Sequence, residues 1–382
     1  MSRKSVNDVF VIGFAMFAMF FGAGNLIFPP YLGLISGGNW GIGFICFMLM
    51  DMGLSIFTLV VVAKIGKGAE GITEVLGRIP SKVILAVNAI CLGPVIAIPR
   101  TAATAYEFSI EPFFPNVSRV AFSLVFFSIV VLFCLKQSKV MDIIGMVFAP
   151  VIFAALVVLI VKGILNPIDT VAFSASLDSA IHSGTDAGYQ TMDVMAAMIL
   201  SSSIFFALRQ KNYTEEKQQF HMILFSGALA ALILAIVYGG LTYLGATASG
   251  IYGDDIDRAS LLIAITETLL GKKGMVFLGG LVCAACITPA IGLLSSAASF
   301  FEKETRGKIS YRTFVILFAG ISCVFSNFGI SRILKIASPI LNIMYPVLIV
   351  LVIVGFIRST FYTQKYIPFS ASMCYNSFKY VK

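Results

Sequence analysis

The sequence predicts an all-α protein that crosses a membrane many times. Hydrophobic residues make up 58% of its 382 residues and charged residues only 12%, which leaves little polar surface for a water-soluble protein. The apolar runs are long enough to span a bilayer, because a spanning helix needs about 20 such residues. The first run carries two glycines, an asparagine and two prolines at its middle. Freed backbone groups at that depth are tolerated only where they line a protein-enclosed cavity, so this helix is expected to be broken beside a binding site.

Hydropathy places ten spans in a transmembrane core of residues 1–357. The predicted spans cover residues 10–34, 41–62, 83–106, 119–135, 141–161, 189–208, 221–246, 274–300, 313–330 and 334–357. The charged start of the chain and the absence of a cleavage site after the first run indicate a retained first helix.

Basic residues predict the orientation. Of the 27 Lys and Arg residues, 19 fall on the side of the N-terminus, seven on the opposite side, and Arg100 lies within a span. The positive-inside rule then places both termini in the cytoplasm. Because these charges are spread over separate short loops, they do not indicate a nucleic-acid partner.

The ten spans divide into five plus five, and the broken first span has a candidate mate in span six. There Asp193 places a carboxylate inside the membrane, and residues 201–203 (SSS) interrupt the apolar run. An odd number of spans in each half makes the second half enter from the opposite side. We therefore expect an inverted repeat with helices one and six broken near the bilayer midplane.

Five segments carry a resemblance to a known family. They are residues 21–30 (FGAGNLIFPP), 93–102 (GPVIAIPRTA), 161–167 (VKGILNP), 188–193 (GYQTMD) and 290–293 (AIGL). They resemble the branched-chain amino acid transport system II carrier proteins, which are bacterial sodium-coupled importers of leucine, isoleucine and valine. That family is similar to the leucine-transporter fold, in which ten helices form the transport core. Family members usually have about twelve spans, so residues 358–382 are expected to be a polar cytoplasmic tail, truncated or replaced relative to the family.

The break in span one suits an amino acid carboxylate. Freed amides and the positive end of a helix dipole favour an anion. By the resemblance, the amides are those of Ala23 and Gly24, with Gly22, Gly24 and Asn25 completing the substrate site. The alternative is that these glycines only allow helices to pack closely.

The substrate ammonium needs carbonyls or an acid. We expect unwound carbonyls of span six near Ala197 and Ser201 to serve. Asp193 is either a direct ligand or an outer gate residue, with the gate favoured, and Arg100 pairs with it or with Glu107. A purely structural ion pair is the alternative.

Asp51 lies at the middle of span two, where the resembled family generally has a small neutral residue. It either takes up a proton, which would allow proton coupling, or is neutralised by a neighbour without a role in transport. The second interpretation is favoured.

Sodium needs oxygen ligands. By the resemblance, these are the carbonyls of Ala18 and Phe21 and the hydroxyl of Ser295, with Ser296 able to compensate for the leucine at position 294. The alternative is that both serines bond to carbonyls one turn back.

The function expected is therefore a sodium-coupled symporter of branched-chain amino acids in the bacterial cytoplasmic membrane. No enzyme motif or cofactor is indicated, and the partners expected are the amino acid, sodium and the bilayer. The alternatives are a transporter-derived sensor, an inactive truncated product, or a proton-coupled amino acid antiporter. Residues 257–270 predict a short amphipathic helix over the outer mouth, either a lid or an ordinary interfacial helix. Cys283 and Cys286 form a lone C-x-x-C pair that we interpret as core residues.

Overall fold

The computed structural model describes residues 3–66, 68–136, 140–171 and 173–361. Over these residues the secondary structure is helical, apart from one isolated bridge between Gly37 and Ser174. The elements are α1 (Arg3–Phe20), α2 (Ala23–Ser36), α3 (Trp40–Met48), η1 (Leu49–Gly53), α4 (Leu54–Ile65), α5 (Gly68–Thr73), η2 (Glu74–Leu76), α6 (Arg78–Ile90), η3 (Cys91–Val95), α7 (Ala97–Ser109), α8 (Arg119–Lys136), α9 (Val140–Leu165), α10 (Leu177–Thr191), α11 (Asp193–Gln210), α12 (Glu216–Thr247), α13 (Arg258–Glu304), α14 (Tyr311–Ser326) and α15 (Ile330–Phe361).

Each of the ten predicted ranges is covered by one helix or by adjoining helices. Among the described residues, five helical segments are long and apolar enough to cross a membrane, and the bent pair α1–α2 makes a sixth. Three shorter apolar helices lie in α8, α9 and α14. The all-α architecture is thus confirmed, while ten crossings stay a prediction. Of the predicted tail, residues 358–361 continue α15 and the rest lies outside the described residues.

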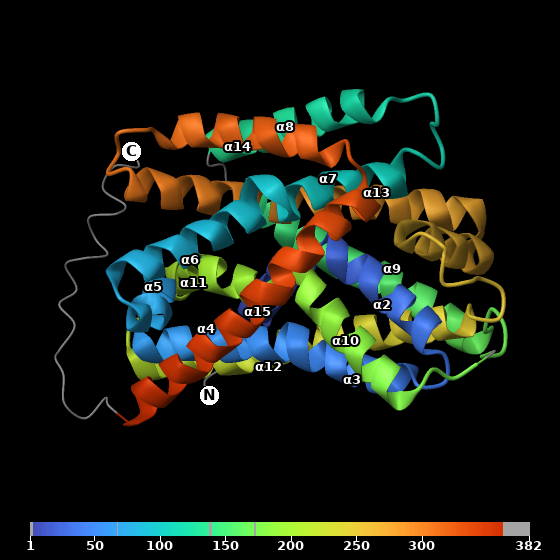
Figure 1. Ribbon diagram of the computed structural model, residues 1–382, viewed down its shortest axis with the longest axis horizontal. Coiled ribbons are helices and arrows are strands. Elements are labelled where there is room, and N and C mark those ends of the chain that lie inside the picture. Colours follow the sequence, from blue (N-terminus) through green and yellow to red (C-terminus); the bar gives the residue numbers. More distant parts are fainter. Residues whose placement is uncertain (1–2, 67, 137–139, 172, 362–382) are drawn as a thin grey trace.

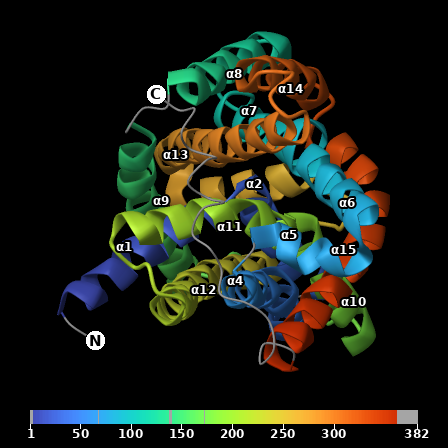
Figure 2. The same ribbon diagram turned by 90° about the vertical axis from the view of Figure 1, so that its left-hand side faces the viewer.

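Helix α2 lies at the centre of the molecule. It packs against α3, α7, α10, α12 and α13, and nearly all its residues are buried. Figures 1 and 2 show α8 and α14 side by side at one edge, far from the other edge where α12, α3 and α4 lie. Helix α15 crosses the near face obliquely in Figure 1. The first apolar run of the sequence is therefore the inner element of the fold.

Two glycines bring α2 and α12 into close contact. A methyl group added to Gly33 would lie 1.8 Å from the Thr242 carbonyl oxygen, and one added to Gly245 would lie 1.8 Å from the Pro30 carbonyl oxygen. Only glycine allows two helix backbones to approach this closely. The crossing fixes α2, the second half of the first predicted span, against α12.

Two helical runs contain a π-helical turn that hydropathy does not predict. The turn η1 separates α3 from α4 and contains Asp51, and η3 separates α6 from α7, where Gly93 leaves helical geometry (φ −81°, ψ −114°) before Pro94. Such turns in a helix are frequent at functional sites because they redirect side chains and free backbone groups.

The predicted amphipathic helix of residues 257–270 forms the start of α13. Asp257 accepts a hydrogen bond from the Ala259 amide at 3.0 Å, and Gly271 (φ 68°) breaks the helix before its long apolar part. The apolar side chains Leu261, Leu262, Ile265 and Leu269 of this segment are buried. The lid role remains a prediction.

Candidate functional site

The first break separates α1 from α2. The two helices meet at an angle of 74° between Phe20 and Ala23. Gly22 is the N-cap of α2 in an extended conformation, and its position carries no side chain that would cap the helix. The first four amides of a helix have no partner within it. The start of α2 therefore presents free amides and a positive dipole end to the interior.

The second break separates α10 from α11 at a single residue, Met192, which has a left-handed backbone (φ 68°, ψ 20°). The unwinding expected near Ala197 and Ser201 is wrong, because both residues lie inside α11. The Ser201 hydroxyl donates to the Met198 carbonyl at 2.7 Å, which is an intrahelical bond. The carbonyls freed by span six are instead those at the end of α10.

Arg100 of α7 binds that helix end. Its guanidinium donates to the carbonyls of Gln190 at 2.5 Å and Thr191 at 3.0 Å. A cation at a helix C-terminus is favoured both by these hydrogen bonds and by the negative end of the dipole. The same guanidinium lies over the Phe28 ring, 5.7 Å from its centroid, and beside Gly24, where a Cβ would be 2.9 Å from Nη2. Arg100 thus connects the second break to the first turn of α2.

The expected pairing of Arg100 is corrected by this arrangement. In the described part of the chain, no nitrogen of Arg100 comes within 4.0 Å of a carboxylate oxygen, so neither Asp193 nor Glu107 forms an ion pair with it. Glu107 instead accepts from Arg119 at 2.9 Å and from the Ile330 amide at 3.1 Å. The Arg100 guanidinium is thus hydrogen-bonded to backbone carbonyls, with Asp193 as a nearby opposite charge.

Asp193 is held by a residue of the first break. The Asn25 side-chain amide donates to Asp193 Oδ2 at 2.9 Å and also to the Tyr238 hydroxyl. Asn25 lies in the first turn of α2, and Asp193 is the first residue of α11, where a negative charge is favoured. This hydrogen bond joins the N-terminal ends of the two half-helices.

Asp51 belongs to the same cluster, which the sequence analysis missed. Thr191 donates its hydroxyl to Asp51 Oδ1 at 2.8 Å, and the carboxyl groups of Asp51 and Asp193 lie within hydrogen-bonding reach of each other. Both carboxyl groups are buried. The only signal in the sequence was that Asp51 and Asp193 are acids inside apolar spans.

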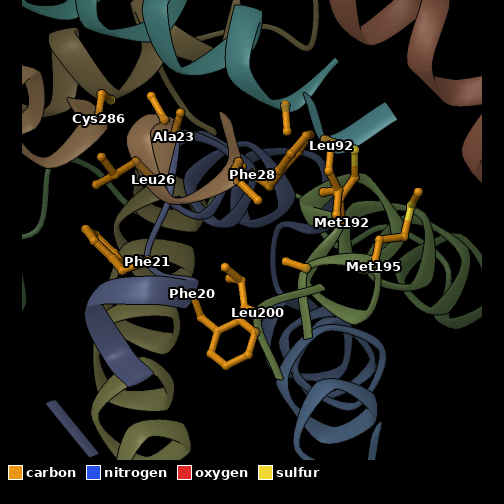
Figure 3. Close-up of a cluster of buried hydrophobic side chains, with 14 of the residues drawn as sticks. Phe20, Phe21, Ala23, Leu26, Phe28, Leu92, Met192, Met195, Leu200 and Cys286 are labelled. Carbon is orange, nitrogen blue, oxygen red and sulfur yellow. The ribbon is translucent and has the colours of Figure 1, made fainter. Parts of the chain in front are cut away.

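Apolar side chains surround the two breaks. Figure 3 shows side chains from α1, α2, η3, Met192, α11 and α13 gathered around them, and all of those labelled are buried. The labelled residues are Phe20, Phe21, Ala23, Leu26, Phe28, Leu92, Met192, Met195, Leu200 and Cys286. The site therefore combines free backbone donors and an acid with an aliphatic and aromatic wall.

The residues assigned to sodium lie on two elements. Ala18 is in the last turn of α1 and Phe21 is at the break, while Ser295 and Ser296 are in α13, which contacts α1. The Ser295 hydroxyl is hydrogen-bonded to the Tyr311 hydroxyl at 2.9 Å. The assignment stays a prediction, with Ser295 already engaged by α14.

Comparison with known proteins finds relatives along most of the chain. A sequence profile described as branched-chain amino acid transport protein matches residues 5–377. The branched-chain amino acid permease BraB of Bacillus subtilis (strain 168) is 33% identical over 362 residues, covering 93% of this chain and 81% of its own. The permease BrnQ of Escherichia coli (strain K12) is 34% identical over 356 residues, covering 92% and 81%.

Two solved structures have a similar fold. Mhp1, a nucleobase-cation-symport-1 family transporter in a closed conformation, matches with a TM-score of 0.61 at 15% identity, covering 89% of this chain and 77% of its own. A Na⁺-coupled sialic acid symporter in a substrate-bound outward-open state matches with a TM-score of 0.57 at 12% identity, covering 91% and 78%. These likenesses show that the helices have the arrangement found in membrane transporters.

The hydrogen bond between the two breaks predicts thermodynamic coupling. In a double-mutant cycle of Asn25→Ala and Asp193→Ala, the thermal stabilities of the purified variants should be non-additive by about 0.5–3 kcal/mol, because the two residues share one interaction. The pair Asn25→Ala and Glu107→Ala is the matched control, since Glu107 is bonded to Arg119 and Ile330. Additive losses in the first pair would contradict the proposed link.

Proposed function

We propose that this chain, which belongs to the family of branched-chain amino acid transport proteins, imports leucine, isoleucine and valine together with sodium by alternating access. The permease relatives and the apolar helices make it a multi-pass membrane protein of a transporter family. The observation that carries the substrate proposal is the meeting of the two helix breaks inside an apolar wall. Such a site has a partner group for each charge of a zwitterion and an apolar surface for its side chain.

The substrate carboxylate binds at the start of α2. The amides of Ala23 and Gly24 are the donors, and the positive end of the helix dipole favours the negative charge. A methyl group on Gly22 would have only the Phe20 carbonyl within 4.0 Å, so there is room beside these amides. The Arg100 guanidinium next to Gly24 adds positive charge on the same side.

The substrate ammonium binds at Asp193. Its Oδ2 accepts from Asn25, which leaves Oδ1 for the substrate. The carbonyls at the end of α10 already accept hydrogen bonds from Arg100, so they are weaker candidates than Asp193 for binding the ammonium. Ala197 and Ser201 then contribute to the wall of the site from α11, and not through unwound carbonyls.

The branched side chain binds against the apolar residues of Figure 3. Phe20, Leu26, Leu92, Met195 and Leu200 come from four elements that meet at the breaks. Burying each methylene of the substrate contributes about 0.8 kcal/mol. This surface favours leucine, isoleucine and valine over polar amino acids, whose side-chain groups would find few partners there.

Alternating access is proposed to operate on a core of ten helices arranged as an inverted repeat, with both termini in the cytoplasm. Hydrogen bonds connect the helices on either side of the two breaks. Near the N-terminal end of α1, Asp8 accepts from Lys211 at 2.6 Å and from Tyr213 at 2.9 Å. At the opposite end, Tyr31 donates to the Asp254 carbonyl at 2.8 Å. Opening either side requires the contacts on that side to separate.

Sodium is proposed as the coupling ion, bound by the carbonyls of Ala18 and Phe21 and by Ser295 or Ser296. In proteoliposomes at constant pH, an inward sodium gradient should drive accumulation of radiolabelled leucine, and replacing sodium by choline should abolish it. The double variant Ser295→Ala, Ser296→Ala should need several-fold more sodium for half-maximal uptake. Accumulation that persists in choline would disprove sodium coupling, and unchanged sodium dependence in the double variant would disprove the site.

The anion site predicts opposite results at two glycines. Gly24→Leu should reduce leucine uptake at least about tenfold, because the new side chain meets the Arg100 guanidinium and fills the space beside the amides, where overpacking costs about 1–3 kcal/mol. Gly41→Ala of α3 is the control and should retain most of the uptake, since no atom lies within 4 Å of the added Cβ. Both are compared at equal abundance in the membrane. Wild-type uptake by Gly24→Leu would refute the site.

A further inference from the structure

The buried charges at the two breaks do not balance. Asp51 is 0% exposed, Arg100 4% and Asp193 5%. If both acids were ionised, two negative charges would face one positive charge in a buried region. Buried charges are tolerated when they are paired, and an excess charge is costly. Without substrate and sodium, the site therefore lacks one positive charge.

The hydrogen-bond pattern shows where that charge is missing. Thr191 donates to Asp51 Oδ1 at 2.8 Å, and Asn25 donates to Asp193 Oδ2 at 2.9 Å. The two carboxyl groups also lie within hydrogen-bonding reach of each other. Among the described residues, no group donates a hydrogen bond to Asp51 Oδ2, although this atom is fully buried. Two carboxylates cannot hydrogen-bond to each other, because neither has a proton to donate.

The other titratable groups around the pair do not supply the missing charge. Tyr238 of α12 and Tyr345 of α15 face both acids, and tyrosine is neutral when protonated. Arg100 of α7 directs its two terminal nitrogens to the carbonyls of Gln190 and Thr191. Arg258 of α13 stacks further out, over the Phe28 and Tyr31 rings.

A proton fits the gap better than a metal ion. The Asn25 amide and the Thr191 hydroxyl direct donors at the two acids, whereas a cation site requires lone pairs directed at the ion. One proton on a facing pair of carboxyl groups removes the repulsion and forms the missing hydrogen bond.

We propose that Asp51 and Asp193 hold one proton between them, and that this proton is exchanged for the ammonium group of the substrate. The second half of the proposal rests on the proposed function, since it needs an amino acid at Asp193. As the ammonium approaches Asp193, its positive charge replaces that of the proton. The O–H bond of the pair breaks and the proton passes to water, so the charge of the two acids together with the ammonium is the same as that of the protonated pair. The negative charge of the substrate carboxylate lies at the start of α2, and the sodium ion of the proposed function balances it. Substrate and proton then oppose each other's binding by the same factor.

Infrared spectroscopy of the purified protein tests the shared proton without any substrate. The carbonyl stretch of a protonated carboxylic acid should be present at neutral pH and lost in Asp51→Asn. It should persist in Glu302→Gln, the matched control, which changes a carboxyl group that accepts a hydrogen bond from the Tyr311 amide. If Asp51→Asn does not fold, Thr191→Val should shift the band, because it removes the donor to Asp51. A band unchanged in the Asp51 or Thr191 variant overturns the shared proton.

The pH dependence of leucine binding tests the exchange. The apparent affinity of the wild type for leucine should fall as the pH is lowered, by up to about tenfold per pH unit, since the proton competes with the ammonium. Asp51→Asn, whatever its affinity, should lose this dependence. A carboxylic acid band together with pH-independent binding would mean that the proton is fixed, which overturns the exchange. If leucine does not bind at any pH, the proposed function fails, while the infrared result still decides whether the proton is shared.

Discussion

The hydrogen bond from Asn25 to Asp193 joins two helices that each begin in the middle of the molecule. Each beginning leaves amides without intrahelical partners, and such groups are costly wherever water is excluded. The structure meets this constraint with side chains from other elements. Asn25 and Tyr238 bind at one junction, while Arg100 takes the carbonyls that α10 leaves free. What remains at the start of α2 is a set of amide donors with no side-chain cap, and these are the donors that we propose to bind the substrate carboxylate.

The rest of the fold places these defects where a ligand can use them. Glycines at the crossing of α2 and α12 fix the second half of the first predicted span, and apolar residues from several elements lie around both breaks. Farther from the breaks, Asp8 is buried and accepts from Lys211 and Tyr213, while Tyr31 makes a single exposed hydrogen bond to the Asp254 carbonyl. Either contact can separate without breaking the hydrogen bonds between the two breaks, as the proposed alternating access requires.

Local composition predicts one of the two helix breaks, whereas the other break and the contacts of the buried acids depend on tertiary structure. The interruption near Gly22 could be predicted, because glycine and proline act on their own backbone. The one at Met192 could not, since methionine has no preference for a left-handed conformation and is held there by the groups that Arg100 binds. The serines near residue 201 do not mark a break in the helix, because a serine hydroxyl can donate to a carbonyl of its own helix. The partner of Asp51 could not be predicted from the sequence, because Thr191, which donates to it, lies 140 residues away in the chain.

The central claim is that the two breaks recognise the two charges of one amino acid, and competition by leucine analogues tests it most directly. Binding of radiolabelled leucine to the purified protein would be challenged with unlabelled leucine, with 3-methylbutylamine, which lacks the carboxylate, and with 4-methylpentanoate, which lacks the ammonium. The account predicts that each analogue competes at least about a hundredfold more weakly than leucine, because each leaves one buried group without its partner. Competition by either analogue at the concentrations at which leucine competes would contradict it.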